Sequence, residues 1–177
     1  MNALVNFFSG HAPDSRGRSF DEIVAFSFER LESSHDYIQW LFPLREPSPV
    51  NPSAPTLDDV TIAAFAADPE LRGALLRGFY RMLGFYGLVL SESPAARGRS
   101  AEFTIAPGPG FAERAVVWLS VGNHNFLRLT RIMKSLTLLG CGAQAGALLA
   151  CLLEVATANP RVIGKGTVGY WVAAAKA

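Results

Sequence analysis

The stretch NHNFLRLTRIMKSL, residues 123–136, decides the fold class of this 177-residue chain. Its apolar residues recur at intervals of three and four, which is the period of an α-helix with one buried face. That apolar stripe consists of Leu129, Ile132, Met133 and Leu136. Either Asn123 or Asn125 can cap the helix at its start. The same period runs through most of the chain and therefore predicts an all-α fold.

Local signals place the other expected helices. Ser19 and Glu22 have the spacing of a capping box, and Pro69 has the position of a first helical residue after the capping Asp68. Pro43 is expected to stop a short helix that begins near residue 35. We expect helices at about 20–33, 35–42, from 56 onward, 69–83, 113–120, from 123 or 125 onward, and 143–158.

Two segments are expected to be non-helical. Residues 43–55 contain five prolines, which favour either an extended, ordered strap or a mobile loop. Residues 91–112 have the composition of a loop, with one possible short strand at 102–105. The expected architecture is a compact single-domain helical bundle over residues 1–177, with about six to eight helices and a long Pro-rich connecting strap.

Composition and charge exclude some classes of protein. Half of the residues (50%) are hydrophobic, which is enough for a sizeable core and excludes wholesale disorder. The net charge of +1 argues against nucleic acid binding by bulk electrostatics. Residues 1–60 contain four basic and nine acidic residues (−5), and residues 61–177 contain twelve and six (+6). Either the two halves have complementary surfaces, or the second half binds an anion.

Metal, cofactor and membrane signals are weak. Cys141 and Cys151 have no Cys or His cluster around them, so we expect two free thiols, no zinc and no cofactor. The N-terminus does not resemble a secretory signal, which favours a reducing, cytoplasmic location. Residues 136–153 carry no formal charge, but the glycines at 140 and 142 predict two buried helices instead of one membrane span. Membrane association is therefore the less favoured of the two alternatives.

Residues 35–42 contain the first candidate binding residues. His35 and Gln39 are four residues apart, which predicts one helical face, and His35 is either a proton shuttle or a structural histidine. Trp40 and Phe42, with the prolines that follow, are expected to form an aromatic surface. Such a surface either receives an extended peptide or pins the strap to the core.

The second candidate site is the start of the helix near residue 123. Its free N–H groups favour an anion, with Asn123, His124 and Asn125 close by. Arg128 and Arg131 fall on a polar stripe beside the apolar one. Two roles remain open for these arginines: they bind a phosphate or carboxylate ligand, or they pair with acidic residues of the first half, such as Glu29, Glu32, Asp36 or Glu46.

Several of these motifs together resemble the conserved domain of the opioid growth factor receptor family. The longest is HDYIQWLFP at residues 35–43, and it is followed by matching residues at 47–48 and 51–55. Further matches follow in order at residues 81–88 (RMLGFYGL), 123–136 and 170–171 (YW), and GRSFDEI at residues 17–23 fits the opening of the domain. The resemblance covers about residues 4–172, nearly the whole chain.

This resemblance implies the fold of the family's domain. Animal members are described as perinuclear or nuclear receptors for an enkephalin-type peptide that restrain cell proliferation, and they carry long tails beyond the domain. The resemblance implies no set of catalytic residues. The composition, rich in Ala, Arg and Gly, predicts a bacterial, single-domain member instead of an animal one.

The residues and the resemblance leave three functional hypotheses. The first is a binding module for a peptide or a small anionic or aromatic ligand, with a pocket where the strap crosses the helix that begins near Asn123. The second is a small-molecule enzyme in which His35 or His124 is the acid/base and Arg128 and Arg131 hold the substrate. The third is an interaction domain, which would expose an apolar patch.

Overall fold

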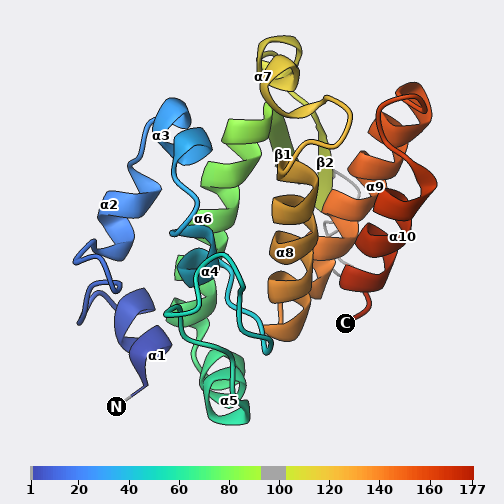
Figure 1. The fold of residues 1–177 in the computed structure, drawn as a ribbon. Helices are drawn as coiled ribbons and strands as arrows, with labels where there is room; N and C mark the ends of the chain where they lie inside the picture. Colours follow the sequence, from blue (N-terminus) through green and yellow to red (C-terminus); the bar gives the residue numbers. More distant parts are fainter. Residues whose placement is uncertain (1, 93–102) are drawn as a thin grey trace.

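The computed structural model describes residues 2–92 and 103–177 as a mostly helical domain (Figure 1). The prediction of a predominantly helical fold is confirmed, and these ranges contain ten helices where about six to eight were expected. The helices are α1 (Ala3–Phe8), α2 (Phe20–Val24), α3 (Phe28–Ser33), α4 (Ile38–Leu41), α5 (Asp59–Ala67), α6 (Pro69–Tyr86), α7 (Phe111–Trp118), α8 (Asn125–Leu138), α9 (Gly142–Ala158) and α10 (Lys165–Ala174).

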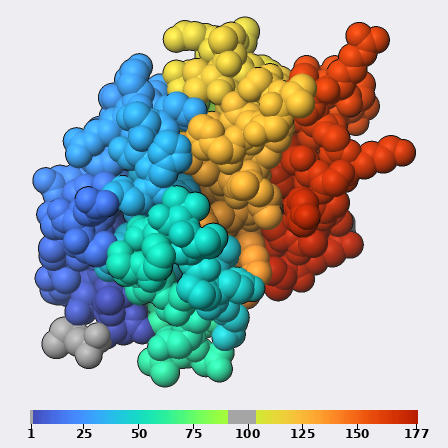
Figure 2. All heavy atoms as spheres, in the orientation of Figure 1, coloured from blue at the N-terminus to red at the C-terminus, as the bar shows by residue number. Residues whose placement is uncertain are grey.

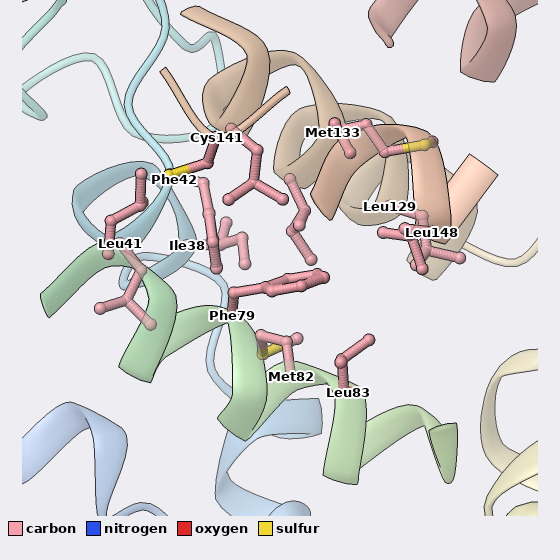
Figure 3. Close-up of a cluster of buried hydrophobic side chains, with 14 of the residues drawn as sticks. Ile38, Leu41, Phe42, Phe79, Met82, Leu83, Leu129, Met133, Cys141 and Leu148 are labelled. Atoms are coloured by element: carbon pink, nitrogen blue, oxygen red, sulfur yellow. The ribbon is translucent and has the colours of Figure 1, made fainter. Parts of the chain in front are cut away.

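The three longest helices organise the core. α8 packs against both α9 and α10, while α6 packs against α1, α2 and α5 on the N-terminal side (Figure 1). Phe79 of α6 is fully buried, and its ring lies between side chains of α4, α8 and α9 (Figure 3). Leu129 of α8 and Leu148 of α9 are also buried there. The apolar stripe that predicts α8 therefore faces the centre of the molecule.

Side-chain caps fix several helix starts as expected. The capping box of Ser19 and Glu22 is present at the start of α2, and the side chain of Asp68 caps α6 with Pro69 in its first turn. Gly140, with a φ of +82°, lies in the turn between α8 and α9. The prediction that residues 136–153 form two helices is therefore confirmed.

Other predicted boundaries are wrong by one or more residues. The helix expected at 20–33 is two helices, because Ser27 accepts a hydrogen bond from the Arg30 N–H and starts α3 anew. α5 begins only after Asp58, whose side chain caps it. α6 continues through Gly84 and ends at Gly87, where φ is +74° and an added Cβ would lie 2.7 Å from the Phe111 Cα.

The sequence patterns missed two helices and most of a hairpin. α1 and α10 lie in terminal segments for which no helix was predicted. The expected loop at 91–112 contains the start of α7 and parts of an antiparallel hairpin, in which β1 (Leu88–Glu92) pairs with β2 (Phe103–Pro107). The predicted strand at 102–105 begins at a residue outside the described ranges. The observed strand β2 extends to Pro107, two residues beyond the predicted end.

The Pro-rich strap, residues 43–55, runs without helix or strand from α4 toward α5. Two hydrogen bonds tie it to neighbouring backbone: the Leu57 N–H donates to the Leu44 carbonyl oxygen at 2.9 Å, and Asn51 Nδ2 donates to the Asp36 carbonyl oxygen at 2.9 Å. Figure 2 shows the strap directly beside α8 on one face of the molecule. The alternative of an ordered strap is therefore the better description.

Candidate functional site

A cavity of about 330 Å³ lies between the strap and α8, and we call it the strap cavity. Its volume is within the range of small-molecule sites in proteins. The strap, the start of α4 and one face of α8 all contribute to it, so the two segments that the sequence singled out meet in space. Five of the predicted site residues line it: His35, Gln39, His124, Arg128 and Arg131.

Two histidines stand at one end of the strap cavity. The ring centroids of His35 and His124 are 5.2 Å apart, and His124 Nε2 lies 3.5 Å from Glu32 Oε1. His35 precedes α4 instead of lying on it, so the prediction of a shared helical face with Gln39 is wrong. Burial and the nearby Arg128 and His35 lower the pKa of His124, against the opposing effect of Glu32. His124 is therefore predominantly neutral at pH 7.

Arg128 is bound to the protein itself. Only 5% of Arg128 is exposed, and its guanidinium donates to the carbonyl oxygens of Leu31 (3.0 Å), Glu32 (3.3 Å) and Ser34 (2.8 Å). Two further acceptors are the Glu32 carboxylate at 3.5 Å and Asn125 Oδ1 at 3.3 Å. This arginine thus ties the end of α3 to α8. For Arg128, the interpretation as a structural partner of the first half is confirmed.

Arg131 is bound differently from Arg128. Arg131 is half-buried, and its Nη1 donates to the Phe42 carbonyl oxygen at 3.1 Å. Burial lowers the pKa of Arg131, and the negative charge of Glu46 opposes this effect. Glu46 itself pairs with Lys134, whose Nζ lies 2.7 Å from the Glu46 carboxylate. Arg131 therefore carries a positive charge at the wall of the cavity. Among the described residues, no carboxylate is in direct contact with its guanidinium.

A buried polar pair lies where α4 meets the strap. Gln39 is 5% exposed and Ser48 is 7% exposed, and Gln39 Nε2 donates to Ser48 Oγ at 3.4 Å. The Asn51 backbone N–H also donates to Ser48 Oγ, at 3.4 Å. Gln39 Oε1 is buried and has no partner among the described residues. Buried polar atoms without partners are uncommon in proteins, which makes this one a candidate contact for a ligand.

Three of the predicted site residues lie outside the cavity lining. Trp40 is 5% exposed and packs against Phe7 at a centroid distance of 5.2 Å, so Trp40 belongs to the core and does not offer a surface to an extended peptide. Asn125 is fully buried and donates to the Glu32 carboxylate at 3.0 Å. The N-cap of α8 is His124, which makes no side-chain capping hydrogen bond, so the prediction of a cap at Asn123 or Asn125 is wrong. Asn123 Oδ1 accepts from the Asn125 N–H at 2.9 Å beside this helix start.

Apolar lining residues were missed in the sequence. Val50 of the strap is 71% exposed and Leu127 of α8 is 70% exposed, and both line the cavity together with Ile38 and Leu44. Leu127 is three residues from His124 and four from Arg131, so the helical spacing of these three residues was the signal available for it. No comparable signal exists in the strap, because an irregular segment has no period.

Neither a metal-binding cluster nor a membrane-spanning helix is present in the part of the chain that the structure describes. No group of three or more His, Cys, Asp or Glu side chains within residues 2–92 and 103–177 is arranged to hold a metal ion. Over the same residues, none of the helices has the length and hydropathy needed to cross a lipid bilayer.

The fold and the cavity define a mostly helical domain with a mixed apolar and basic cavity of ligand size. Sequence comparison then identifies its family: the model of the opioid growth factor receptor (OGFr) conserved region matches residues 12–177, and the chain belongs to this family. The resemblance seen in the sequence is therefore confirmed. No solved structure is significantly similar to the chain.

Three similar proteins come from vertebrates. The opioid growth factor receptor of Mus musculus is 40% identical over 129 residues, which are 72% of this chain and 19% of the relative. The Homo sapiens receptor is also 40% identical, over 64% of this chain and 16% of its own length. Opioid growth factor receptor-like protein 1 of Rattus norvegicus is 35% identical over 82% of this chain and 30% of its own length.

These relatives limit what can be transferred. The matched region is a minor part of each of them, so the activity of the whole relatives comes to this chain only as a proposal. The expected bacterial origin has no support from these matches, because all three are vertebrate proteins.

Proposed function

We propose that the strap cavity is a ligand-binding site and that this chain is a binding module for a peptide or a small anionic or aromatic ligand. The observation that carries the proposal is the joint lining of one cavity by the strap and α8. Both segments belong to the motifs that resemble the family. Close packing of the strap on α8 for stability alone would leave no open cavity between them.

The chemistry of the lining supports an amphipathic ligand. Ile38, Leu44 and Val50 offer apolar contact from one side, and Leu127 offers it from α8. Arg131 adds a positive charge on the same face of α8 as Leu127. Apolar walls with a few polar groups that fix orientation are typical of small-ligand sites.

The relatives support a receptor-like role. Those of Mus musculus and Homo sapiens are named opioid growth factor receptor. Since the resemblance implies an enkephalin-type peptide for animal members, such a peptide is a reasonable first probe. A reducing, cytoplasmic location remains part of the proposal, supported by the two buried cysteines, which are both free.

The test is a titration of the ¹⁵N-labelled chain with an enkephalin-type peptide, followed by NMR. Saturable shifts are expected at residues of the strap and α8. Leu127→Glu places an acid at the exposed rim and should weaken binding of the peptide carboxylate by about tenfold or more, with little effect on folding because Leu127 is 70% exposed.

Val116→Glu is the matched control, because Val116 is 82% exposed on α7 and does not line the cavity. This variant should bind like the unmodified chain. Equal binding by Leu127→Glu, or shifts confined to another face, would overturn the proposal.

The enzyme hypothesis remains as a second candidate because of one observation. Both histidines line the strap cavity, and His124 lies beside Glu32 and Arg128. A neutral histidine in a cavity is a suitable general base. The enzyme hypothesis predicts that His35→Gln and His124→Gln abolish turnover of a cavity-bound probe while binding of that probe persists. Unchanged turnover in these variants would exclude the enzyme hypothesis.

A further inference from the structure

The cationic side chains of the strap cavity are not equivalent as ligand partners. Arg128 is occupied by backbone carbonyls and Glu32, and Lys134 is neutralised by Glu46 at 2.7 Å. Arg131 makes one hydrogen bond within the described residues, to the Phe42 carbonyl oxygen. A guanidinium has five N–H donors, so most of those of Arg131 remain for a ligand. Arg131 is therefore the cationic side chain of the cavity that is best placed to bind an anion.

Ser48 adds a neutral donor on the strap side. Its Oγ accepts hydrogen bonds from Gln39 Nε2 and from the Asn51 N–H, so its two lone pairs are used. None of the described residues accepts the hydroxyl proton of Ser48. Because Ser48 lines the cavity, its O–H is available to an oxygen atom of a ligand.

Gln39 supplies the complementary acceptor. Its Oε1 is buried without a partner among the described residues, while its Nε2 is held by Ser48. A ligand N–H that reached Gln39 Oε1 would satisfy this atom, and leaving a buried acceptor unsatisfied is unfavourable. The cavity thus offers a cation and an O–H donor for an oxyanion, together with one acceptor for an N–H.

We infer that the strap cavity has a subsite for an N-acylated apolar amino acid with a free carboxylate, in which Arg131 and Ser48 hold the carboxylate and Gln39 Oε1 accepts the amide N–H. The apolar side chain of this group packs against Ile38, Leu44 and Val50. The inference rests on the proposed function of the cavity. The same chemistry occurs in free N-acyl amino acids and at the C-terminus of a peptide.

Matched probes test the subsite without changing the protein. The probes are N-acetyl-leucine, N-acetyl-leucine amide, and an acetylated tripeptide that ends in leucine with a free carboxylate. We expect both free acids to shift the resonances of Gln39, Ser48 and Arg131, and the amide to bind at least about tenfold more weakly. Tighter binding by the tripeptide identifies a peptide C-terminus as the source, and tighter binding by N-acetyl-leucine identifies the free acyl amino acid.

A charge-neutralising variant provides the second arm. Arg131→Gln should abolish the preference for the acid over the amide, and Arg131→Lys should restore part of it. Arg45→Gln removes an equal charge from the strap, where Arg45 pairs with the exposed Asp59 outside the cavity lining, and should keep the preference.

Equal binding of acid and amide at the cavity overturns the subsite and leaves the cavity as a binding site. If instead none of these probes nor the enkephalin-type peptide perturbs the cavity, the proposed function fails as well.

Discussion

Replacement of Arg128 by methionine is expected to destabilise the fold strongly. Methionine keeps the apolar stem of the side chain but removes every N–H donor. The carbonyl oxygens of Leu31, Glu32 and Ser34, now bound at 2.8–3.3 Å, would lose their partner at the junction of α3 and α8. This tie joins residues more than ninety positions apart in the chain, so no local contact replaces it.

The magnitude follows from burial and from the number of bonds. A hydrogen bond to a charged group contributes about 1.5–3 kcal/mol, and Arg128→Met removes the bonds to three carbonyl oxygens at once. Because Arg128 is 5% exposed, solvent cannot replace its bonds fully. We expect Arg128→Met to lower the free energy of unfolding by about 3–5 kcal/mol, which corresponds to roughly 10 °C in Tm for a chain of this size.

Urea denaturation at pH 7, followed by circular dichroism, measures this change. Arg45→Met is the control, since the Arg45–Asp59 pair is 48% and 88% exposed and is expected to contribute less than about 1 kcal/mol. Arg128→Lys should recover only part of the loss, because an ammonium cannot reach all three carbonyls. A loss below about 1 kcal/mol in Arg128→Met would refute the structural role and return Arg128 to the list of ligand-binding candidates.

Three further predictions concern backbone strain, pH and thiol chemistry. Gly87→Ala should lower the free energy of unfolding by more than about 1 kcal/mol, because φ is +74° and the new Cβ would meet the Phe111 Cα. Gly73→Ala, on the open face of α6, should raise the free energy of unfolding by up to about 1 kcal/mol. Urea melts measure both changes. Burial lowers the pKa of His124 in the folded state, so His124 in the unfolded chain binds a proton at higher pH. The free energy of unfolding should therefore fall as the pH drops below 6.5. In melts from pH 7 to pH 5, His124→Asn should show a weaker dependence on pH. Burial raises the pKa of the Cys151 thiol to about 11 and also that of Cys141, so a thiol reagent at pH 8 should modify both only after unfolding, and rapid reaction of the folded chain would contradict their burial.

Much of the fold was predictable because its signals are local. The apolar spacing of α8 and the caps at Ser19 and Asp68 each depend on residues a few positions apart. The errors arise where two local signals compete. Ser27 caps a new helix inside a continuous apolar pattern, and Gly84 allows α6 to continue to a second glycine at residue 87.

The candidate site was predictable only in part. The two segments were identified from their unusual residues, but the roles of Arg128 and Arg131 depend on which carbonyl groups lie opposite them across the fold. Trp40 is adjacent to Gln39 in sequence, yet it faces α1 while Gln39 lines the cavity. Such differences arise from tertiary packing, which no spacing rule encodes.

The most direct test of the central claim is the set of intermolecular NOEs between bound N-acetyl-leucine and the methyl groups of the protein. A ligand in the strap cavity predicts NOEs from the leucine methyls to those of Ile38, Leu44 and Val50, which line the cavity from α4 and the strap. NOEs only to another face of the domain, such as the surface between α9 and α10, would contradict the claim.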